Sequence, residues 1–466
     1  MLTIPLQFDS KEPLYQQIYY YIRRAIETGA IEADEKLPSK RKLSAHLRVS
    51  VSTVETAYAQ LKAEGYLYTK AKSGCHAAAV RLEKVRSRFH ALPQSLREET
   101  ETRPFLYDFR TDRVDPEAFP FSVWAKLTRE VLSEGKTELL ESVHPKGLYQ
   151  LRVNIADHLL QFRGIEILPE QIIIGAGWEY LLTLIIQLLG RSRCYGVEDP
   201  GYQKVPKILR SLGCSVCYLP MDNEGISMDA AASSMAEVLH VTPSHHFPLG
   251  TVTSAVRRRD LLRWAEQGER YLIEDDYDSE FRYEGRPIPA LLEMDHGGRV
   301  IYIKTFAKSL APSLRIAYMV LPLPLLEQYE KQLLFYASTV SSIEQQVLSR
   351  FIGGGYLERH LNRSRNLYKK RRDIFIETMR KSSLSSRLEI LGKDAGMHLL
   401  LRVKGMTEQE LVAKAQQNSI SLNGLSRYYH YPETAPQNTV IAGYAGWQEE
   451  HLRQGAAALA QALSEP

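Results

Sequence analysis

An aspartate, a tyrosine and a lysine follow two apolar runs that are typical of buried strands. The run 271–273 leads to Asp275 and Tyr277, and the run 300–303 leads to Lys308. Because open α/β sheets bind ligands at the carboxyl ends of their strands, these side chains are expected to meet there. A lysine forms an imine with an aldehyde, a carboxylate keeps a pyridine nitrogen protonated, and a phenol bonds the ring oxygen. The set therefore predicts a site for pyridoxal 5'-phosphate, with Lys308 carrying the imine.

The phosphate of this cofactor requires helix-terminal N–H groups, a hydroxyl and an arginine. Ala176 and Gly177 stand between the apolar run 172–174 and a helical pattern, where glycine lets the backbone approach a phosphate closely. Thr305 and Arg315 follow another run and are expected to contact the same phosphate.

Each residue also has a simpler explanation. A lysine at a strand end is usually a solvated surface residue, Asp275 can cap a helix, and Gly177 can belong to a plain turn. Tyr202, expected to stack on the face of the cofactor ring, is also a reasonable rim aromatic. The order and spacing of all of these residues together favour the cofactor site.

The elements expected to position these residues form an α/β domain. From residue 107 onward, short apolar runs alternate with segments of helical periodicity, which predicts a mostly parallel, buried sheet. Long helical segments dominate after about residue 320, and residues 388–460 are expected to form a smaller α+β lobe. The expected strands are 172–174, 194–197, 216–219, 238–241, 271–273 and 300–303.

The N-terminal residues predict a different unit. A helical pattern begins after Pro13 and ends at Gly29, and Ser39 and Ser50 are expected to cap two further helices. Residues 66–77 predict a small hairpin with a basic tip. Three helices and such a hairpin are the plan of a winged helix-turn-helix, which binds duplex DNA. The alternative is a small helical module that binds another protein.

DNA contacts are expected from three parts of this unit. Ser52 and Thr53 begin the third helix, where hydroxyl groups reach bases or phosphates. Lys40 and Arg41 on the preceding helix are placed to hold phosphates, and Lys72 at the hairpin tip can reach the adjacent groove. The net charge of +4 and the surplus of basic residues in this region agree with a polyanionic partner.

A chain of 466 residues is too long for one ordinary core. We expect a DNA-binding domain over 1–78, a linker over 79–105 and a cofactor-binding domain over 106–466. No apolar run reaches the roughly 18 to 20 residues of a membrane span, and no export signal precedes the first helix, so the cytoplasm is the expected compartment. Cys214 and Cys217 are expected to face opposite sides of a strand, so no metal site is predicted there.

Residues 10–77 resemble the GntR family of winged-helix repressors. The resemblance implies DNA contacts from Arg41, Ser52, Thr53 and the wing around Gly74. The family commonly has arginine where this chain has Val51, which could instead pack on a thymine methyl group, so operator preference stays open. The resemblance is carried by 37–43, 49–54, Ala57, Tyr58, Leu61, 64–67, Ser73 and Gly74.

Residues 105–460 resemble the fold-type-I aminotransferases, and within them the MocR/GabR type of regulator. The resemblance implies a homodimer in which each DNA-binding domain crosses to the partner's large domain. It also implies a regulator that senses an effector by aldimine exchange at Lys308, rather than a full transaminase. The motifs that carry it are Trp124, 147–152, 198–202, 242–250, 274–281 and 305–310.

Three departures from that pattern concern the effector. Lys204 stands where related regulators have arginine, and it would bind a carboxylate as a point charge. Asn438 stands where aminotransferases commonly have an arginine, so Arg427 is the candidate for that role. Trp178 and Glu179 replace a small residue and glutamine, which predicts a tighter pocket. The effector is left open between an amine, an amino acid and the cofactor itself.

Two other functions fit the same sequence. The chain could be a working aminotransferase whose DNA-binding domain is vestigial, or a DNA-binding protein whose large domain only mediates dimerisation. Turnover with amino donors and 2-oxo acids would favour the first, and failure to bind the cofactor would favour the second.

Overall fold

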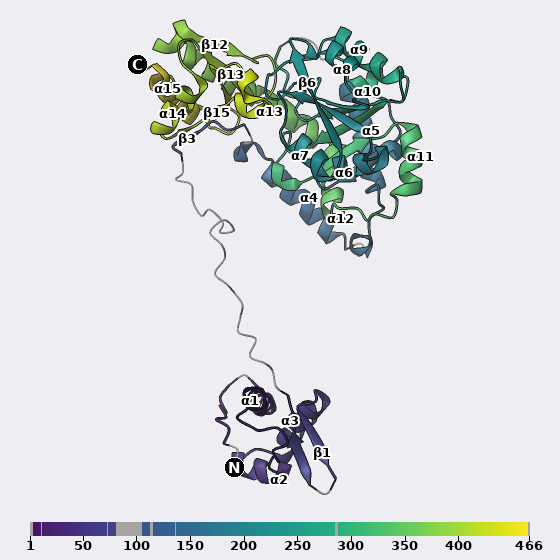
Figure 1. Ribbon diagram of the computed structural model, residues 1–466, viewed down its shortest axis with the longest axis vertical. Coiled ribbons are helices and arrows are strands. Elements are labelled where there is room, and N and C mark those ends of the chain that lie inside the picture. Colours follow the sequence, from purple (N-terminus) through teal and green to yellow (C-terminus); the bar gives the residue numbers. More distant parts are fainter. Residues whose placement is uncertain are drawn as a thin grey trace. The chain divides into compact units, whose positions relative to one another are not determined.

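The computed structural model describes residues 3–10, 12–71, 73–80, 105–111, 115–135, 137–284 and 288–464. The chain divides into two compact units, Met1–Thr102 and Arg103–Pro466 (Figure 1). Most of the predicted linker, 81–104, lies outside the described residues, as does Lys72. No helix among the described residues is long and apolar enough to cross a bilayer.

The first unit has the elements expected of a winged helix-turn-helix. The Ser39 and Ser50 hydroxyls accept hydrogen bonds from the N–H groups of Lys42 and Thr53, which confirms both predicted helix caps. Gly29 ends the first helix in the left-handed conformation, with φ of 77°. The elements are α1 (Leu14–Thr28), α2 (Lys40–Leu47), α3 (Val51–Ala63), β1 (Leu67–Lys70) and β2 (Gly74–Ala77).

The core of this unit lies between α1 and α3. Ile18 and Ile22 of α1 are fully buried against Val54 and Tyr58 of α3. The Tyr58 hydroxyl donates to the carbonyl of Pro38 at 2.9 Å, which ties α3 to the segment that leads into α2. The apolar spacing in α1 therefore places its buried face against α3, the helix predicted to contact DNA.

Within the described residues, the second unit contains an eight-stranded sheet in the order β4-β11-β10-β9-β8-β5-β6-β7. Strands β10, β9, β8, β5 and β6 are consecutively parallel, which confirms the mostly parallel sheet. The bounds are β4 (Ile172–Gly175), β5 (Cys194–Asp199), β6 (Ser215–Asp222), β7 (Gly225–Ile226), β8 (Val238–Val241), β9 (Tyr271–Asp276), β10 (Val300–Thr305) and β11 (Ala317–Val320).

Helices cover both faces of this sheet, which explains why its strands are apolar without alternation. Along β10, Ile301 and Ile303 pack with α6, α7 and α11, whereas Tyr302 packs on the other face with α4, α5 and α12. The helices are α4 (Phe121–Ser133), α5 (Tyr149–Arg163), α6 (Trp178–Leu189), α7 (Lys204–Ser211), α8 (Met228–Ser233), α9 (Ala255–Glu266), α10 (Leu291–Met294), α11 (Leu323–Gln332), α12 (Ser342–Gly353) and α13 (Tyr356–Arg380).

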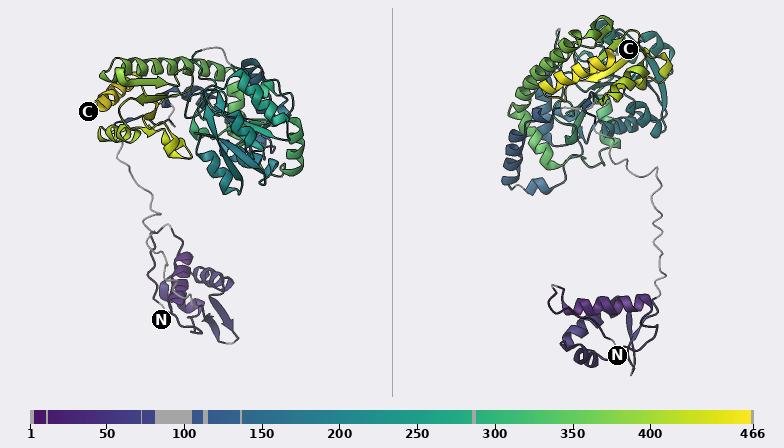
Figure 2. Two further views of the ribbon diagram at one scale, coloured as in Figure 1. Left: turned by 45° about the horizontal axis from the view of Figure 1, so that its top comes forward. Right: turned by 90° about the vertical axis from the view of Figure 1, so that its left-hand side faces the viewer.

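A smaller α+β lobe follows α13, as the sequence predicts (Figure 2). Its antiparallel sheet has the order β12-β13-β16-β15. The first strand of the second unit, β3 (Tyr107–Asp108), pairs in parallel with β14 (Ile420–Ser421) and so belongs to this lobe. The other elements are β12 (Leu388–Leu391), β13 (His398–Val403), α14 (Glu408–Gln417), β15 (Asn423–Gly424), β16 (Thr439–Gly443) and α15 (Glu449–Ser464).

Candidate functional site

The residues predicted to bind the cofactor ring leave the sheet at one edge. Strands β9 and β10 are parallel neighbours, with Asp275 beside Ile303, so the segments that follow them emerge side by side. Tyr277 lies one residue beyond β9, and Lys308 lies three residues beyond β10. The fold therefore brings these predicted residues to the same carboxyl edge.

Asp275 is 8% exposed and has an unsatisfied oxygen. Its Oδ2 lies 3.4 Å from Nε2 of His240, on the neighbouring strand β8, while its Oδ1 is buried with no hydrogen-bond partner among the described residues. Burial raises the pKa of Asp275, and His240 opposes that shift. A buried carboxylate oxygen without a donor is costly, and a protonated pyridine nitrogen is a donor that would satisfy it.

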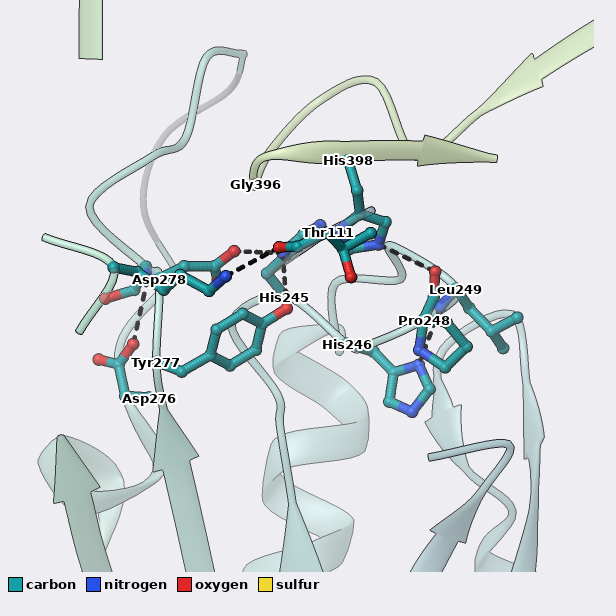
Figure 3. Close-up of polar contacts among 12 residues, drawn as sticks. Thr111, His245, His246, Pro248, Leu249, Asp276, Tyr277, Asp278, Gly396 and His398 are labelled. Atoms are coloured by element: carbon teal, nitrogen blue, oxygen red, sulfur yellow. Dashed lines mark hydrogen bonds and ion pairs between the residues drawn. The ribbon is translucent and has the colours of Figure 1, made fainter. Parts of the chain in front are cut away.

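Tyr277, His245 and Asp278 meet at one imidazole nitrogen (Figure 3). His245 Nδ1 lies 3.0 Å from the Tyr277 hydroxyl and 2.8 Å from Oδ2 of Asp278. Burial holds the pKa of Tyr277 well above its ordinary value, so the phenol keeps its proton. The protonated phenol is able to donate a hydrogen bond, which is the role predicted for it at the ring oxygen.

The loop before β13 covers this cluster (Figure 3). A side chain on Gly396 would place its Cβ 1.8 Å from Cε1 of His245, so the two residues are in direct contact. His398 lies next to them, with its ring 5.1 Å from that of His245, and its Nε2 lies 3.0 Å from the carbonyl oxygen of Pro248. Burial lowers the pKa of His398 well below its ordinary value, so this second imidazole is neutral.

The Lys308 ammonium is directed to the backbone. Its Nζ donates to the carbonyl of Thr111 at 2.9 Å. Thr111 follows β3, and the same segment supports the C-terminal lobe, since the N–H of Gly443 donates to the carbonyl of Phe109 at 2.7 Å. The predicted imine-forming lysine is thus held by a segment that the sequence did not single out.

The predicted phosphate residues come together at the start of α6. Gly177 is the N-cap of this helix, with φ of 93° and no side-chain cap, and a Cβ there would lie 2.6 Å from Nη2 of Arg315. The N–H of Ala176 donates to Oγ1 of Thr339 at 2.9 Å. Thr305 Oγ1 accepts from the N–H of Ala307 at 3.1 Å. A bare helix N-terminus beside a guanidinium suits an anion.

An acidic side chain occupies the same place. Oε2 of Glu179 accepts from Nη2 of Arg315 at 2.8 Å, and its Oε1 lies 3.4 Å from Nζ of Lys204. Partial burial acts to raise the pKa of Glu179, but a hydrogen bond from its own backbone N–H, followed by Arg315 and Lys204, lowers the pKa overall. Lys204, predicted to bind an effector carboxylate, is therefore paired within the protein itself.

Aromatic rings line the approach to Asp275. Tyr202 is 42% exposed, and its ring meets Trp178 edge-on with centroids 6.1 Å apart. Trp178 in turn meets the His240 ring at 5.7 Å. Trp178 is buried, and the tighter pocket that its size predicts stays a prediction.

The loop that carries Tyr202 is fixed to the C-terminal lobe. The carbonyl of Tyr428 accepts from the N–H of Gly201 at 3.1 Å and from Nε2 of Gln203 at 2.6 Å. Arg427, next to Tyr428, is exposed, and its Nη1 lies 3.5 Å from Oδ1 of Asn423. The predicted effector residues therefore lie on segments that contact each other.

The predicted DNA-binding residues occupy the surface of the first unit. Arg41 and Ser52 are exposed, and Thr53 is partly exposed. The hydroxyls of Ser52 and Thr53 lie 2.8 and 2.7 Å from that of Ser50, so the helix cap also fixes their orientation. Lys40 is ion-paired with Glu55 of α3.

The hairpin presents Gly74 at an exposed position with φ of 106°. Its neighbour Lys70 lies 2.5 Å from Oδ2 of Asp34, so that lysine supports the base of the wing. Lys72, also predicted to contact DNA, lies outside the described residues.

The sequence did not point to the histidines. His245 lies in the 242–250 motif and His240 in a predicted strand, but their spacing indicates no role, and His398 and Thr111 lie outside the motifs. Two adjacent histidines in the 242–250 motif were the available signal for His245.

Comparison with known proteins agrees with both units. Residues 14–76 match the bacterial regulatory proteins of the gntR family. The chain is 40% identical to the uncharacterized HTH-type transcriptional regulator YdeL of Bacillus subtilis (strain 168), over 95% of each chain. It is 33% identical to the probable rhizopine catabolism regulatory protein MocR of Rhizobium meliloti, over 98% of this chain and 95% of that one. It is 32% identical to the HTH-type pyridoxine biosynthesis transcriptional regulator PdxR of Corynebacterium glutamicum, over 100% and 99%.

Solved structures similar to the large unit are aminotransferases. The multiple substrate aminotransferase of Thermococcus profundus superposes with a TM-score of 0.68 at 24% identity, over 78% of this chain and 92% of that one. The kynurenine aminotransferase of Pyrococcus horikoshii gives 0.67 at 23% identity, over 78% and 91%. At this identity the similarity establishes the fold.

Proposed function

Since the chain belongs to the MocR-type helix-turn-helix transcriptional regulators, with a gntR-family head and an aminotransferase-fold domain, we propose that it regulates transcription through pyridoxal 5'-phosphate held on Lys308. The observation that carries the proposal is the buried Oδ1 of Asp275, which has no hydrogen-bond partner in the part of the chain that the structure describes and lies at the same sheet edge as Lys308. An aspartate in that state is explained by a bound cation or N–H donor.

Each surrounding residue then has a task toward the cofactor. Asp275, supported by His240, would keep the pyridine nitrogen protonated, and the Tyr277 hydroxyl would donate to the ring oxygen. Arg315 and the N-terminus of α6 would bind the phosphate, and Tyr202 would lie on the ring face. When bound, the cofactor supplies an aldehyde that one amine can occupy at a time.

Effector sensing would follow because only one amine at a time can occupy the aldehyde of the cofactor. An effector amine would replace the amine of Lys308, and the released ammonium would donate to the carbonyl of Thr111 as it does here. Lys204 and Arg427 would bind an acidic group on the effector. The two states differ in the contacts of Lys308, and such a difference is required for a ligand to shift a conformational equilibrium.

The proposed partners are duplex operator DNA, a second copy of the chain, and an amine, amino acid or cofactor-related effector. In a homodimer with crossed heads, exchange at Lys308 would change the spacing of the two heads. Half-site spacing determines whether both heads can bind one operator.

The test is covalent mapping. Borohydride reduction of the cofactor-treated protein, followed by peptide mass analysis, should place the adduct on Lys308, and Lys308→Ala should give none. The treated wild-type protein should bind a fragment of its own promoter, with an affinity that an amine effector changes. An adduct on another lysine would contradict the assignment, and multiple turnovers with an amino donor and a 2-oxo acid would indicate an enzyme instead.

A further inference from the structure

A carboxylate of the protein itself, that of Glu179, lies at the N-terminus of α6. Gly177 leaves the helix N-terminus without a side-chain cap, and Arg315 lies directly over it. Glu179, two residues into the helix, accepts from Arg315 at 2.8 Å. Helix N-termini carry a partial positive charge, so this carboxylate satisfies both positive groups at once.

A second cation, Lys204, lies close enough to bind the Glu179 carboxylate when Arg315 no longer does. Nζ of Lys204 lies 3.4 Å from Oε1, the carboxylate oxygen that does not bond Arg315. Glu179 is 32% exposed and Arg315 is 56% exposed, so neither is fixed by burial. The carboxylate therefore has a position bridging both cations and a position available on Lys204 alone.

A phosphate group bound at the same place would compete for the same donors. Nη2 of Arg315 is used by Glu179, and two anions beside one helix N-terminus repel each other. Building on the proposed function, we propose that Glu179 is an internal competitor of the cofactor phosphate. The carboxylate must give up Arg315 before the phosphate can bind, so the chain exchanges its cofactor with the free pool instead of retaining it.

The alternative role for Glu179 is helix stabilisation alone, because acidic residues in a first turn are favourable. Glu344 provides a matched control, since it also lies in the first turn of a helix, α12, and is exposed. If the alternative holds, Glu179→Gln and Glu344→Gln should both lower thermal stability slightly and leave cofactor affinity unchanged.

The decisive measurement compares two aldehydes on the full-length protein. Pyridoxal 5'-phosphate and pyridoxal form the same imine, but only the first has a phosphate. We expect Glu179→Gln to bind pyridoxal 5'-phosphate about tenfold more tightly than wild type, the size of a partly exposed ion pair plus like-charge repulsion. Affinity for pyridoxal should stay the same in both proteins, and Glu344→Gln should match wild type throughout.

Equal affinity of wild type and Glu179→Gln for pyridoxal 5'-phosphate would overturn the inference, as would an equal gain for both aldehydes. Circular dichroism checks that the variant is folded. Glu179→Asp, which shortens the reach to Arg315, should show a smaller gain in the same direction.

Inorganic phosphate separates this inference from the proposed function. Millimolar phosphate should raise the melting temperature of cofactor-free Glu179→Gln more than that of wild type, whether or not Lys308 forms an imine. A missing adduct at Lys308 would refute the proposed function. An equal phosphate effect on the two proteins would refute the competition.

Discussion

Gly396 lies against the imidazole of His245, so closely that a methyl group at residue 396 would be 1.8 Å from Cε1 of the ring. The glycine has φ of 78°, and its carbonyl accepts from the hydroxyls of Tyr283 and Tyr444 at 2.7 and 2.6 Å. Since the loop is held in this way, the ring of His245 would have to move if residue 396 became larger.

Gly396→Ala should therefore unfold more easily and bind the cofactor less well. We expect a loss of about 3 kcal/mol in unfolding free energy, from the left-handed backbone and the overpacked ring together. Gly405 is the matched control, because it has φ of 77° in the same lobe but nothing within 4 Å of its Cβ position. Gly405→Ala should lose only about 1 kcal/mol, and equal losses in denaturant titrations would contradict the close contact.

Asp275→Asn should lower cofactor affinity by about tenfold or more, because the amide cannot carry the negative charge that holds a pyridinium. Burial raises the pKa of Asp275, so the cofactor-free variant should be at least as stable as wild type above neutral pH. Absorbance titration and thermal unfolding measure the two effects. Asp260→Asn, on the surface of α9, should change neither property. Unchanged affinity in Asp275→Asn would remove Asp275 from the site.

The stability of the folded protein should depend on pH through Glu198. This carboxyl group is buried, with Thr242 donating to it at 3.0 and 2.6 Å, and burial raises its pKa to about 7. A raised pKa in the folded state means that stability is fully present below the ordinary carboxyl value and is lost as pH rises toward 7. Wild type should lose roughly 3 kcal/mol across that interval relative to Glu198→Gln. Parallel stability curves for the two proteins would show that Glu198 is ionised throughout.

Arg41→Ala should weaken binding to operator and to unrelated DNA alike, and should reduce the salt-dependence slope by about 1, as loss of one phosphate contact does. Arg129→Ala removes the same charge from α4 and should leave both unchanged. Ser52→Ala should instead alter which sequences are preferred. Fluorescence anisotropy at several salt concentrations distinguishes these outcomes, and an Arg41 effect restricted to the operator would indicate a base contact.

Local signals allowed much of the fold to be predicted. The caps at Ser39 and Ser50 depend on residues three positions away, and the predicted strands are short, mainly apolar runs. Strand β11 was not among the predicted strands, although Ala317–Val320 is also a short apolar run, and its place between β10 and β4 comes from antiparallel pairing with both.

The same distinction applies to the site. Asp275, Tyr277 and Lys308 follow strands, so their common edge could be predicted from chain order. The contact of His245 with Gly396 joins segments about 150 residues apart, and Glu179 meets Arg315 across 136 residues. Such pairs depend on tertiary packing, which periodicity does not encode.

The pairing of β3 with β14 determines which lobe of the large unit the chain from the DNA-binding head joins. Among the described residues, the large unit begins with a strand of the C-terminal lobe, and the same lobe carries Gly396, which lies against His245. Any ligand that draws this lobe inward would move the attachment point of the head by the same displacement.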